Sequence, residues 1–333
     1  MTQARMHLVC VEETPYYHCI GRCVRRAFLC GVDESTHSSY EHRRVWISER
    51  LSILSDVFAV DICAYAILSN HYHLVARIAS ERAASWSNRE VVERWTQLFE
   101  GIPVAHRFLN GETLDDSEAH LLATHIQKWQ ARLGSLSWFM RCLNEHIARR
   151  ANAEDGCTGH FWESRFKSQA LLDETALITA MAYVDLNPVR AKLASSIEQS
   201  DFTSAQDRSR DVTSQPHTLD IHQRPPLLPF AEVVRQSDHD YLPFALKDYL
   251  DLVDSTGRAV LSGKRGSIDA DTPKLIQSLP INPERWFDTV TQLQRHYERA
   301  VGAPDRLRGL ANRSGQQWLR GTGRARRLYL SSG

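Results

Sequence analysis

Two short segments of this sequence carry side chains that could act together on a phosphodiester. The first contains His71 and His73, and the second contains Tyr183 and Asn187. Two neutral imidazoles can chelate one cation, and a divalent cation beside a tyrosine can polarise a phosphate for attack by the phenol oxygen. These residue types indicate metal-assisted chemistry with a tyrosine nucleophile, provided that the fold brings the two segments together.

The two histidines fall in residues 60–78, which are rich in β-branched and aromatic residues and break at Leu68-Ser69-Asn70. Such a pattern predicts two strands with a tight connection. Successive side chains of a strand point to opposite faces, so His71 and His73 share one face. A His-x-His pair also occurs as two unrelated strand histidines and in many zinc sites, and both interpretations stay open at this point.

The tyrosine segment is predicted to be a helix that begins after Asp173, whose carboxylate is a favourable N-cap. Leu177 and Met181 recur at helical spacing and form the expected buried stripe. Tyr183 lies off that stripe and on the side of Asn187, because residues four apart are neighbours on a helix surface. We therefore expect a tyrosine that is accessible for chemistry. The alternative is a rim tyrosine followed by a helix-ending Asn-Pro.

Four segments in order along the chain resemble the IS200-like single-tyrosine transposases of the HUH nuclease superfamily, and most closely the REP-associated tyrosine transposases of bacteria. They are Tyr17-His18-Cys19-Ile20-Gly21-Arg22, Ser69-Asn70-His71-Tyr72-His73-Leu74-Val75, Gly159-His160-Phe161-Trp162-Glu163-Ser164-Arg165-Phe166-Lys167 and Tyr183-Val184-Asp185-Leu186-Asn187-Pro188-Val189-Arg190-Ala191. The resemblance covers about residues 7–195. It departs at Ser69, where relatives often carry proline, and at residues 80–120, which are longer than the usual connection.

The resemblance implies a DNA transposase that cleaves and rejoins single-stranded DNA through a 5′-phosphotyrosine. Tyr183 would be the nucleophile, and His71, His73 and Asn187 would hold the metal. Mg²⁺ or Mn²⁺ is expected rather than zinc, because oxygen atoms of phosphate and water would fill the remaining positions. The implied partner is single-stranded DNA with hairpin-forming ends. A monomer is favoured over a dimer because of the added C-terminal region.

Periodicity predicts an α+β chain, and the resemblance implies a ferredoxin-like antiparallel sheet with packed helices, the fold of HUH nucleases. Strands are expected at 16–23, 60–78 and 162–170. Helices are expected at 42–57, 90–98, 118–133, 136–150, 173–187, 243–254 and from 282 to about 302. The domain division is a nuclease domain at 1–195, a polar linker or arm at 196–229, and a mainly helical region with a basic tail at 230–333.

The overall composition is that of an ordinary globular protein, with 42% hydrophobic and 24% charged residues. The formal net charge is +0, so bulk charge does not favour nucleic acid as a partner. Seven cysteines without a Cys-x-x-Cys pair favour reduced thiols in a cytoplasmic protein. The sequence has no signal-peptide pattern and no apolar run long enough to span a membrane, which favours the same location.

Local basic and aromatic residues are the candidates for contacts with DNA, because arginine pairs with phosphate and aromatic rings stack on bases. They are Arg22, Arg25, Arg165, Lys167, Arg190, Arg313, Trp318, Arg320 and Arg324. A solvated helix with its leucines packed inward is the alternative for the tail.

Two other function classes remain open. The chain could be a non-catalytic nucleic-acid-binding relative recruited for host use, although binding alone requires none of the four proposed site residues. It could also be a zinc hydrolase, but the sequence lacks a His-Glu-x-x-His pattern.

Overall fold

One five-stranded sheet organises the protein, with strand order β2-β3-β1-β4-β5. The computed structural model describes residues 9–24, 29–33, 36–217, 219–231, 240–262 and 273–330. The strands are β1 (Tyr16–Arg22), β2 (Val60–Ile67), β3 (His71–Ile78), β4 (Lys167–Leu171) and β5 (Ala300–Val301). The expected strand pair of residues 60–78 is therefore present as β2 and β3, joined by a tight turn.

The sheet is mixed rather than antiparallel. β1 pairs antiparallel with β3 and β4, and β2 pairs antiparallel with β3, but β5 lies parallel to β4. The expectation of an antiparallel sheet is thus correct for four strands and wrong for the fifth. The predicted strand 162–170 is also shorter than expected, since β4 begins at Lys167. Before it, Trp162 makes only an isolated bridge to Cys23.

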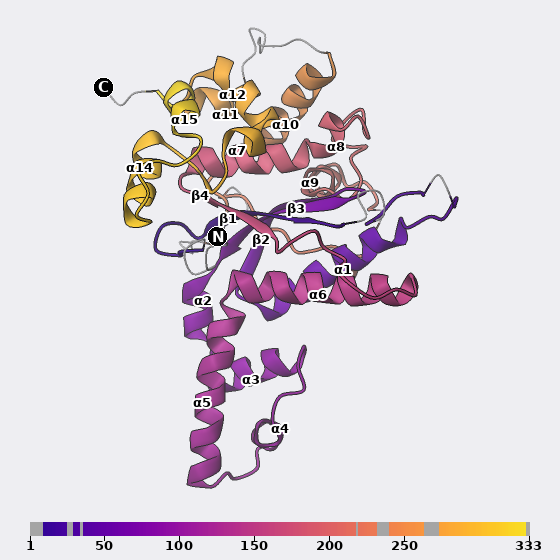
Figure 1. Ribbon diagram of the computed structural model, residues 1–333, viewed down its shortest axis with the longest axis vertical. Helices are drawn as coiled ribbons and strands as arrows, with labels where there is room; N and C mark the ends of the chain where they lie inside the picture. The colour runs from indigo at the N-terminus through magenta and orange to yellow at the C-terminus, as the bar shows by residue number, and fades with distance from the viewer. Residues whose placement is uncertain are drawn as a thin grey trace.

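Helices cover both faces of the sheet (Figure 1). On one face lie α1 (His42–Val57) and α6 (Leu136–Glu154), and on the other lies α7 (Glu174–Asp185). The remaining helices are α2 (Ser80–Ser85), α3 (Asn88–Thr96), α4 (Pro103–Leu109), α5 (Asp116–Leu133), α8 (Asn187–Arg190), α9 (Ser204–Thr213), η2 (Ile221–Gln223), α10 (Leu246–Leu261), α11 (Lys274–Ser278), α12 (Pro283–Thr291), α13 (Leu293–His296), α14 (Pro304–Arg313) and α15 (Thr322–Leu328).

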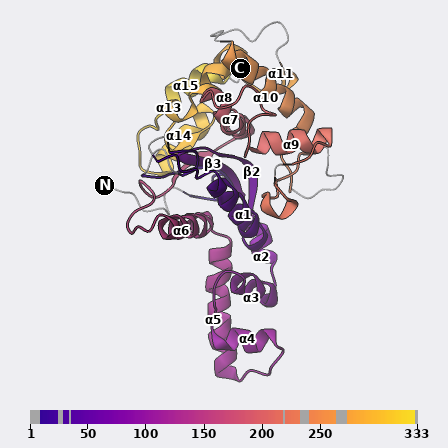
Figure 2. The same ribbon diagram turned by 90° about the vertical axis from the view of Figure 1, so that its right-hand side faces the viewer.

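The long stretch after β3 forms a helical finger. Helices α3, α4 and α5 project together away from the sheet, as both views show (Figure 2). Trp95 stacks on Trp129 with ring centroids 5.3 Å apart, so the finger has an aromatic core of its own. The unusual length of residues 80–120 thus corresponds to an added structural unit rather than to an irregular loop.

Helix α7 is the central helix of its face. It begins as predicted, because the Asp173 carboxylate accepts a hydrogen bond from the backbone N–H of Ala176 at 2.8 Å. Nearly all of its residues are buried, since the sheet lies on one side and the C-terminal helices lie on the other. A helix enclosed in this way has no solvent-exposed face.

The C-terminal region is packed into the same molecule. α12 ends at Thr291, so the prediction of one helix reaching about residue 302 is wrong; the chain forms α13 and then β5 instead. Tyr329 donates a hydrogen bond to Asp173, 2.8 Å away, which connects the residue after α15 to the start of α7. Within residues 196–229, Thr203 and Arg208 are buried against β2.

None of the seven cysteines, all of which lie in the described ranges, forms a disulfide. Among the helices of the described residues, none is long and apolar enough to cross a bilayer.

Candidate active site

Three histidines lie on the face of the sheet that is covered by α7. In the antiparallel ladder, His73 lies opposite Ile20 and His18 lies opposite Val75. His71 is two residues from His73 and therefore on the same face, as the alternation of the strand predicted. The ring centroids of His71 and His73 are 4.9 Å apart, and those of His18 and His73 are 5.2 Å apart. The site is thus built from two neighbouring strands.

Tyr183 brings α7 into this histidine cluster. Its ring lies edge-on to His73 and His18, with ring centroids 5.6 Å and 5.7 Å away. The guanidinium of Arg190 lies over the phenol ring, with Cζ 4.0 Å from the ring centroid. The structure therefore unites the two sequence segments that carry the proposed chemistry.

Tyr183 is more enclosed than the sequence predicted. Its exposed fraction is 6%, and that of His73 is 1%. The expectation of an accessible tyrosine is wrong, because Tyr183 faces the sheet, where its ring packs against His73 and His18 and is covered by Arg190. His71 is only half-buried, and Arg22, its partner in the ladder, is exposed. The site is therefore open to solvent at this end of β1 and β3.

The imidazoles are held neutral at physiological pH. Burial, together with the nearby Arg22 and Arg190, lowers the pKa of His71 to about 4. Burial and the neighbouring histidines lower the pKa of His73 well below its usual value. Neutral imidazole is the form that binds metals. Two arginines around neutral histidines also suit an anionic substrate.

Several features of the site fit a divalent metal. Nε2 of His73 is buried without a hydrogen-bond partner in the described chain, so its lone pair is available to a cation. Nδ2 of Asn187 is also buried without a partner there, but an amide nitrogen only donates, so Asn187 would bind a cation through its side-chain oxygen. Nδ1 of His71 is hydrogen-bonded to the side-chain oxygen of Asn70, which leaves its Nε2 as the nitrogen with a lone pair. In the described part of the chain, no three His, Cys, Asp or Glu side chains gather to hold a metal. The donor set available is thus two imidazoles and the Asn187 amide, one turn beyond Tyr183.

His18 is the site residue that the sequence reasoning missed. It is fully buried and lies in the first segment of the resemblance, but no role was given to it. Its Nε2 is 2.9 Å from Nδ1 of His73, and its Nδ1 is 2.8 Å from Oε1 of Gln169. The amide nitrogen of Gln169 donates to the backbone carbonyl of Tyr297 at 2.9 Å. The period-two pattern of β1 could have placed His18 on this face.

Asp185 anchors helix α7 to its neighbouring helices. Its carboxylate is fully buried and accepts hydrogen bonds from the Ser204 hydroxyl at 2.5 Å and the Ala205 N–H at 2.9 Å. The Tyr249 hydroxyl of α10 donates to it as well. Burial raises the pKa of Asp185, while these donors oppose that rise. The residue between Tyr183 and Asn187 therefore connects α7 to α9 and α10.

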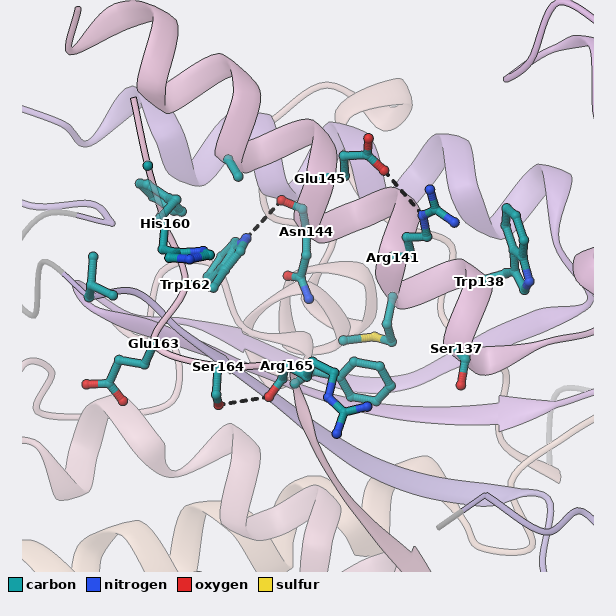
Figure 3. Close-up of a pocket in the computed structure, with 16 residues that line it drawn as sticks. Ser137, Trp138, Arg141, Asn144, Glu145, His160, Trp162, Glu163, Ser164 and Arg165 are labelled. Atoms are coloured by element: carbon teal, nitrogen blue, oxygen red, sulfur yellow. Dashed lines mark hydrogen bonds and ion pairs between the residues drawn. The ribbon is translucent and has the colours of Figure 1, made fainter. Parts of the chain in front are cut away.

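A groove of about 890 Å³ runs between α6 and residues 159–166 (Figure 3). Trp138 and Arg165 line it, and the indole N–H of Trp162 donates to the backbone carbonyl of Asn144 at 2.8 Å. Tyr72, which alternates with the two site histidines, reaches Asn144 on this side. The groove therefore lies on the sheet face opposite Tyr183. Arg165 is exposed there.

The other candidate DNA contacts lie on the surface, apart from Arg190 in the site. Lys167 is exposed at the start of β4, and Arg25 lies outside the described residues. All seven tail arginines are exposed: Arg306, Arg308, Arg313, Arg320, Arg324, Arg326 and Arg327. Trp318 is 70% exposed, whereas Leu307 and Leu328 are buried. The tail thus packs Leu307 and Leu328 inward and presents its arginines and Trp318 to solvent.

Some of these arginines already have partners in the protein. Arg313 pairs with Glu13, Arg324 pairs with Asp288, and Arg320 donates to the backbone carbonyl of Arg295. Contact with DNA stays a prediction for each of them.

Comparison with known proteins does not assign the chain to a family. No family model matches the chain, and no curated protein matches it. A structural match is to a REP-associated tyrosine transposase bound to a REP hairpin, with a TM-score of 0.32 and 13% sequence identity. The match covers 72% of this chain and 100% of the other. At these values a shared function does not follow from the likeness.

Proposed function

We propose that this chain is a transposase of the single-tyrosine HUH type, which cleaves and rejoins single-stranded DNA. The observation that carries the proposal is the edge-on packing of Tyr183 against His73, at 5.6 Å between ring centroids, beside the half-buried His71. The strand order β2-β3-β1-β4, with α1 and α6 together on one face, is also the arrangement expected of a ferredoxin-like HUH fold.

In the proposed reaction the Tyr183 oxygen attacks phosphorus and the bond between phosphorus and the 3′-oxygen breaks. The phenol proton passes to water, and the departing 3′-oxygen takes up a proton to become a free hydroxyl. The DNA 5′ end is then held as a phosphotyrosine, which another 3′-hydroxyl can attack to rejoin the strands. A bound Mg²⁺ or Mn²⁺ would polarise the phosphate as a Lewis acid. His71, His73 and Asn187 would hold that ion.

The arginines around the site suit a DNA substrate. Arg190 packs on the Tyr183 ring and fixes it, while its charge favours a phosphate close by. Arg22 is exposed at the open end of the site and can bind the DNA backbone. On the far face, the aromatic residues of the groove beside Arg165 offer surfaces on which bases could stack.

A second candidate is a non-catalytic nucleic-acid-binding protein. The burial of Tyr183 favours it, because a side chain that is 6% exposed is hard for a DNA strand to reach. One experiment separates the two. The protein is incubated with Mn²⁺ and single-stranded oligonucleotides from the flanks of its own gene, and the products are run on a denaturing gel. A protein–DNA adduct that survives denaturant and is absent with Tyr183→Phe supports cleavage. Tight binding without an adduct supports the second candidate.

A further inference from the structure

The proton of the neutral His73 ring can sit on Nδ1 or on Nε2, and only the first choice leaves Nε2 with a lone pair for a cation. The hydrogen bonds behind His73 decide between them. The decision starts at Tyr297, whose backbone carbonyl can only accept. The side chain of Gln169 must therefore present its amide nitrogen to that carbonyl, 2.9 Å away, and turn its oxygen the other way.

The orientation of Gln169 then fixes His18. The Gln169 oxygen is 2.8 Å from Nδ1 of His18, and because it only accepts, the proton of His18 lies on Nδ1. Nε2 of the neutral His18 ring is then an acceptor. It lies 2.9 Å from Nδ1 of His73, so the proton of His73 is on Nδ1. Nε2 of His73, buried and without a partner among the described residues, carries the lone pair.

The opposite arrangement is disfavoured by two contacts. A proton on Nε2 of His18 would set the lone pair of its Nδ1 against the Gln169 oxygen at 2.8 Å. Turning the Gln169 amide would remove that repulsion but would set two oxygens against each other at Tyr297, 2.9 Å apart. The Gln294 side chain lies 3.5 Å from Nδ1 of His73, at the limit of hydrogen bonding, and its amide can turn to present an oxygen.

We infer that Gln169 and His18 are positioning residues that point the lone pair of His73 Nε2 into the site, with the Tyr297 carbonyl as their anchor. The metal in this inference rests on the proposed function, whereas the proton positions do not. Tyr297 lies just before β5, so the C-terminal region is a structural part of the active site. Metal-binding histidines are commonly fixed in this way by the partner of their other ring nitrogen.

Two substitutions at His18 test the inference in the full-length protein. His18→Leu fills the buried position with an apolar side chain and removes the acceptor for the Nδ1 proton of His73. His18→Gln is the conservative change, since its amide can accept from His73 and donate to Gln169. His125→Leu, on α5 in the finger, is the matched control. Thermal melts and circular dichroism establish that each variant is folded.

The first measurement is a long-range ¹H–¹⁵N NMR spectrum of the histidine rings without metal. We expect His73 to have a protonated Nδ1 and an unprotonated Nε2 in the wild-type protein and in His18→Gln, and a mixture of the two forms in His18→Leu. The second is Mn²⁺ binding without DNA, followed by electron paramagnetic resonance. His18→Leu should bind about 10- to 100-fold more weakly than the wild type, as for other partners of metal ligands.

A wild-type spectrum with the proton on Nε2 of His73 overturns the inference. So does a folded His18→Leu variant whose spectrum and Mn²⁺ affinity match those of the wild type. Failure of the proposed function has a different signature: the wild type shows the expected proton positions but forms no Tyr183–DNA adduct. The two ideas are therefore tested separately.

Discussion

The guanidinium of Arg190 lies over the ring of Tyr183, with Cζ 4.0 Å from the ring centroid. The same side chain donates a hydrogen bond to the backbone carbonyl of Thr291 at 2.7 Å. One arginine thus holds the proposed nucleophile and the end of α12 together. The ring of Tyr183 is fixed by packing that does not require its hydroxyl. The hydroxyl can therefore be removed without disturbing the packing, which makes its role as nucleophile testable.

Changing Tyr183 to phenylalanine removes the proposed attacking oxygen but keeps the ring that packs against His73 and Arg190. We expect DNA cleavage to fall by about 10⁴-fold or more, as when the nucleophile of other covalent enzymes is removed. The free energy of unfolding and the affinity for single-stranded DNA should change little. Denaturing gels, urea titration and fluorescence anisotropy measure the three quantities. A phenylalanine variant that still forms a covalent DNA adduct refutes the assignment.

His71 is the better histidine for testing the metal, because it is half-buried and its loss leaves the packing of His73 on His18 intact. His71→Ala should weaken Mn²⁺ binding by about 10- to 100-fold, since one of two imidazole donors is lost. Chelation with EDTA should stop cleavage by the wild type, and added Mn²⁺ or Mg²⁺ should restore it. Undiminished cleavage in EDTA would contradict the metal model.

Acid should destabilise the protein through its buried histidines. Burial lowers the pKa of His18 from 6.5 in a free peptide to about 4 in the folded protein. The unfolded chain therefore binds more protons between these values. The stability contributed by the neutral ring is complete above about pH 6.5 and is lost as the pH falls towards 4, by about 3 kcal/mol at most.

This pH dependence can be measured from urea unfolding midpoints between pH 7.5 and 4.5. His18→Gln removes the titrating ring and should flatten the curve by the share that His18 contributes. If wild type and variant lose the same stability over this range, His18 is not the source of the acid sensitivity.

Asp185 should be important for stability rather than for chemistry. Asp185→Ala leaves the buried Tyr249 hydroxyl and the Ser204 hydroxyl without their acceptor and removes the connection from α7 to α10. We expect a loss of about 3–5 kcal/mol in the free energy of unfolding. Asp251→Ala, at an exposed position of α10, is the control and should change it by about 0.5 kcal/mol or less. A loss below about 1 kcal/mol at Asp185 would contradict this role.

The tail should contribute to DNA binding through its surface. Deleting it would also expose the core around Leu307 and Leu328, so single surface substitutions are the cleaner test. Trp318→Ala should weaken single-stranded DNA binding by about 1–3 kcal/mol if a base stacks on the indole. Arg320→Gln should reduce the slope of log K against log salt by about 0.7 for one lost phosphate contact. Arg89→Gln, in the finger, serves as the control. Unchanged affinity and salt slope would make the tail a packing element alone.

Local patterns were enough to predict that His71 and His73 share one face of a strand and that α7 starts after Asp173. Alternation in a strand and an N-cap depend on neighbours in the sequence, and both are confirmed. The burial of Tyr183 could not be predicted in the same way. A helical wheel identifies one packed face, but α7 is packed on two sides, by the sheet that Tyr183 faces and by helices that come much later in the chain.

Long-range contacts account for the other differences. β5 is two residues long, too short to show a period, and is defined by its pairing with β4. The role of His18 depends on Gln169 and on the carbonyl of Tyr297, which no spacing rule connects. The domain division at residues 195 and 229 stays a prediction.

The parallel pairing of β5 with β4 has a consequence for the timing of folding. The Gln169–Tyr297 hydrogen bond spans 128 positions, and the Asp173–Tyr329 hydrogen bond spans 156. Contacts so distant in sequence form late, because a long loop must close before they stabilise anything. During synthesis on the ribosome, the site histidines and Tyr183 leave the exit tunnel well before Tyr297 and Tyr329 do. The site is therefore assembled only after Tyr297 has been synthesised, and a product that stops before residue 297 lacks the anchor of His18.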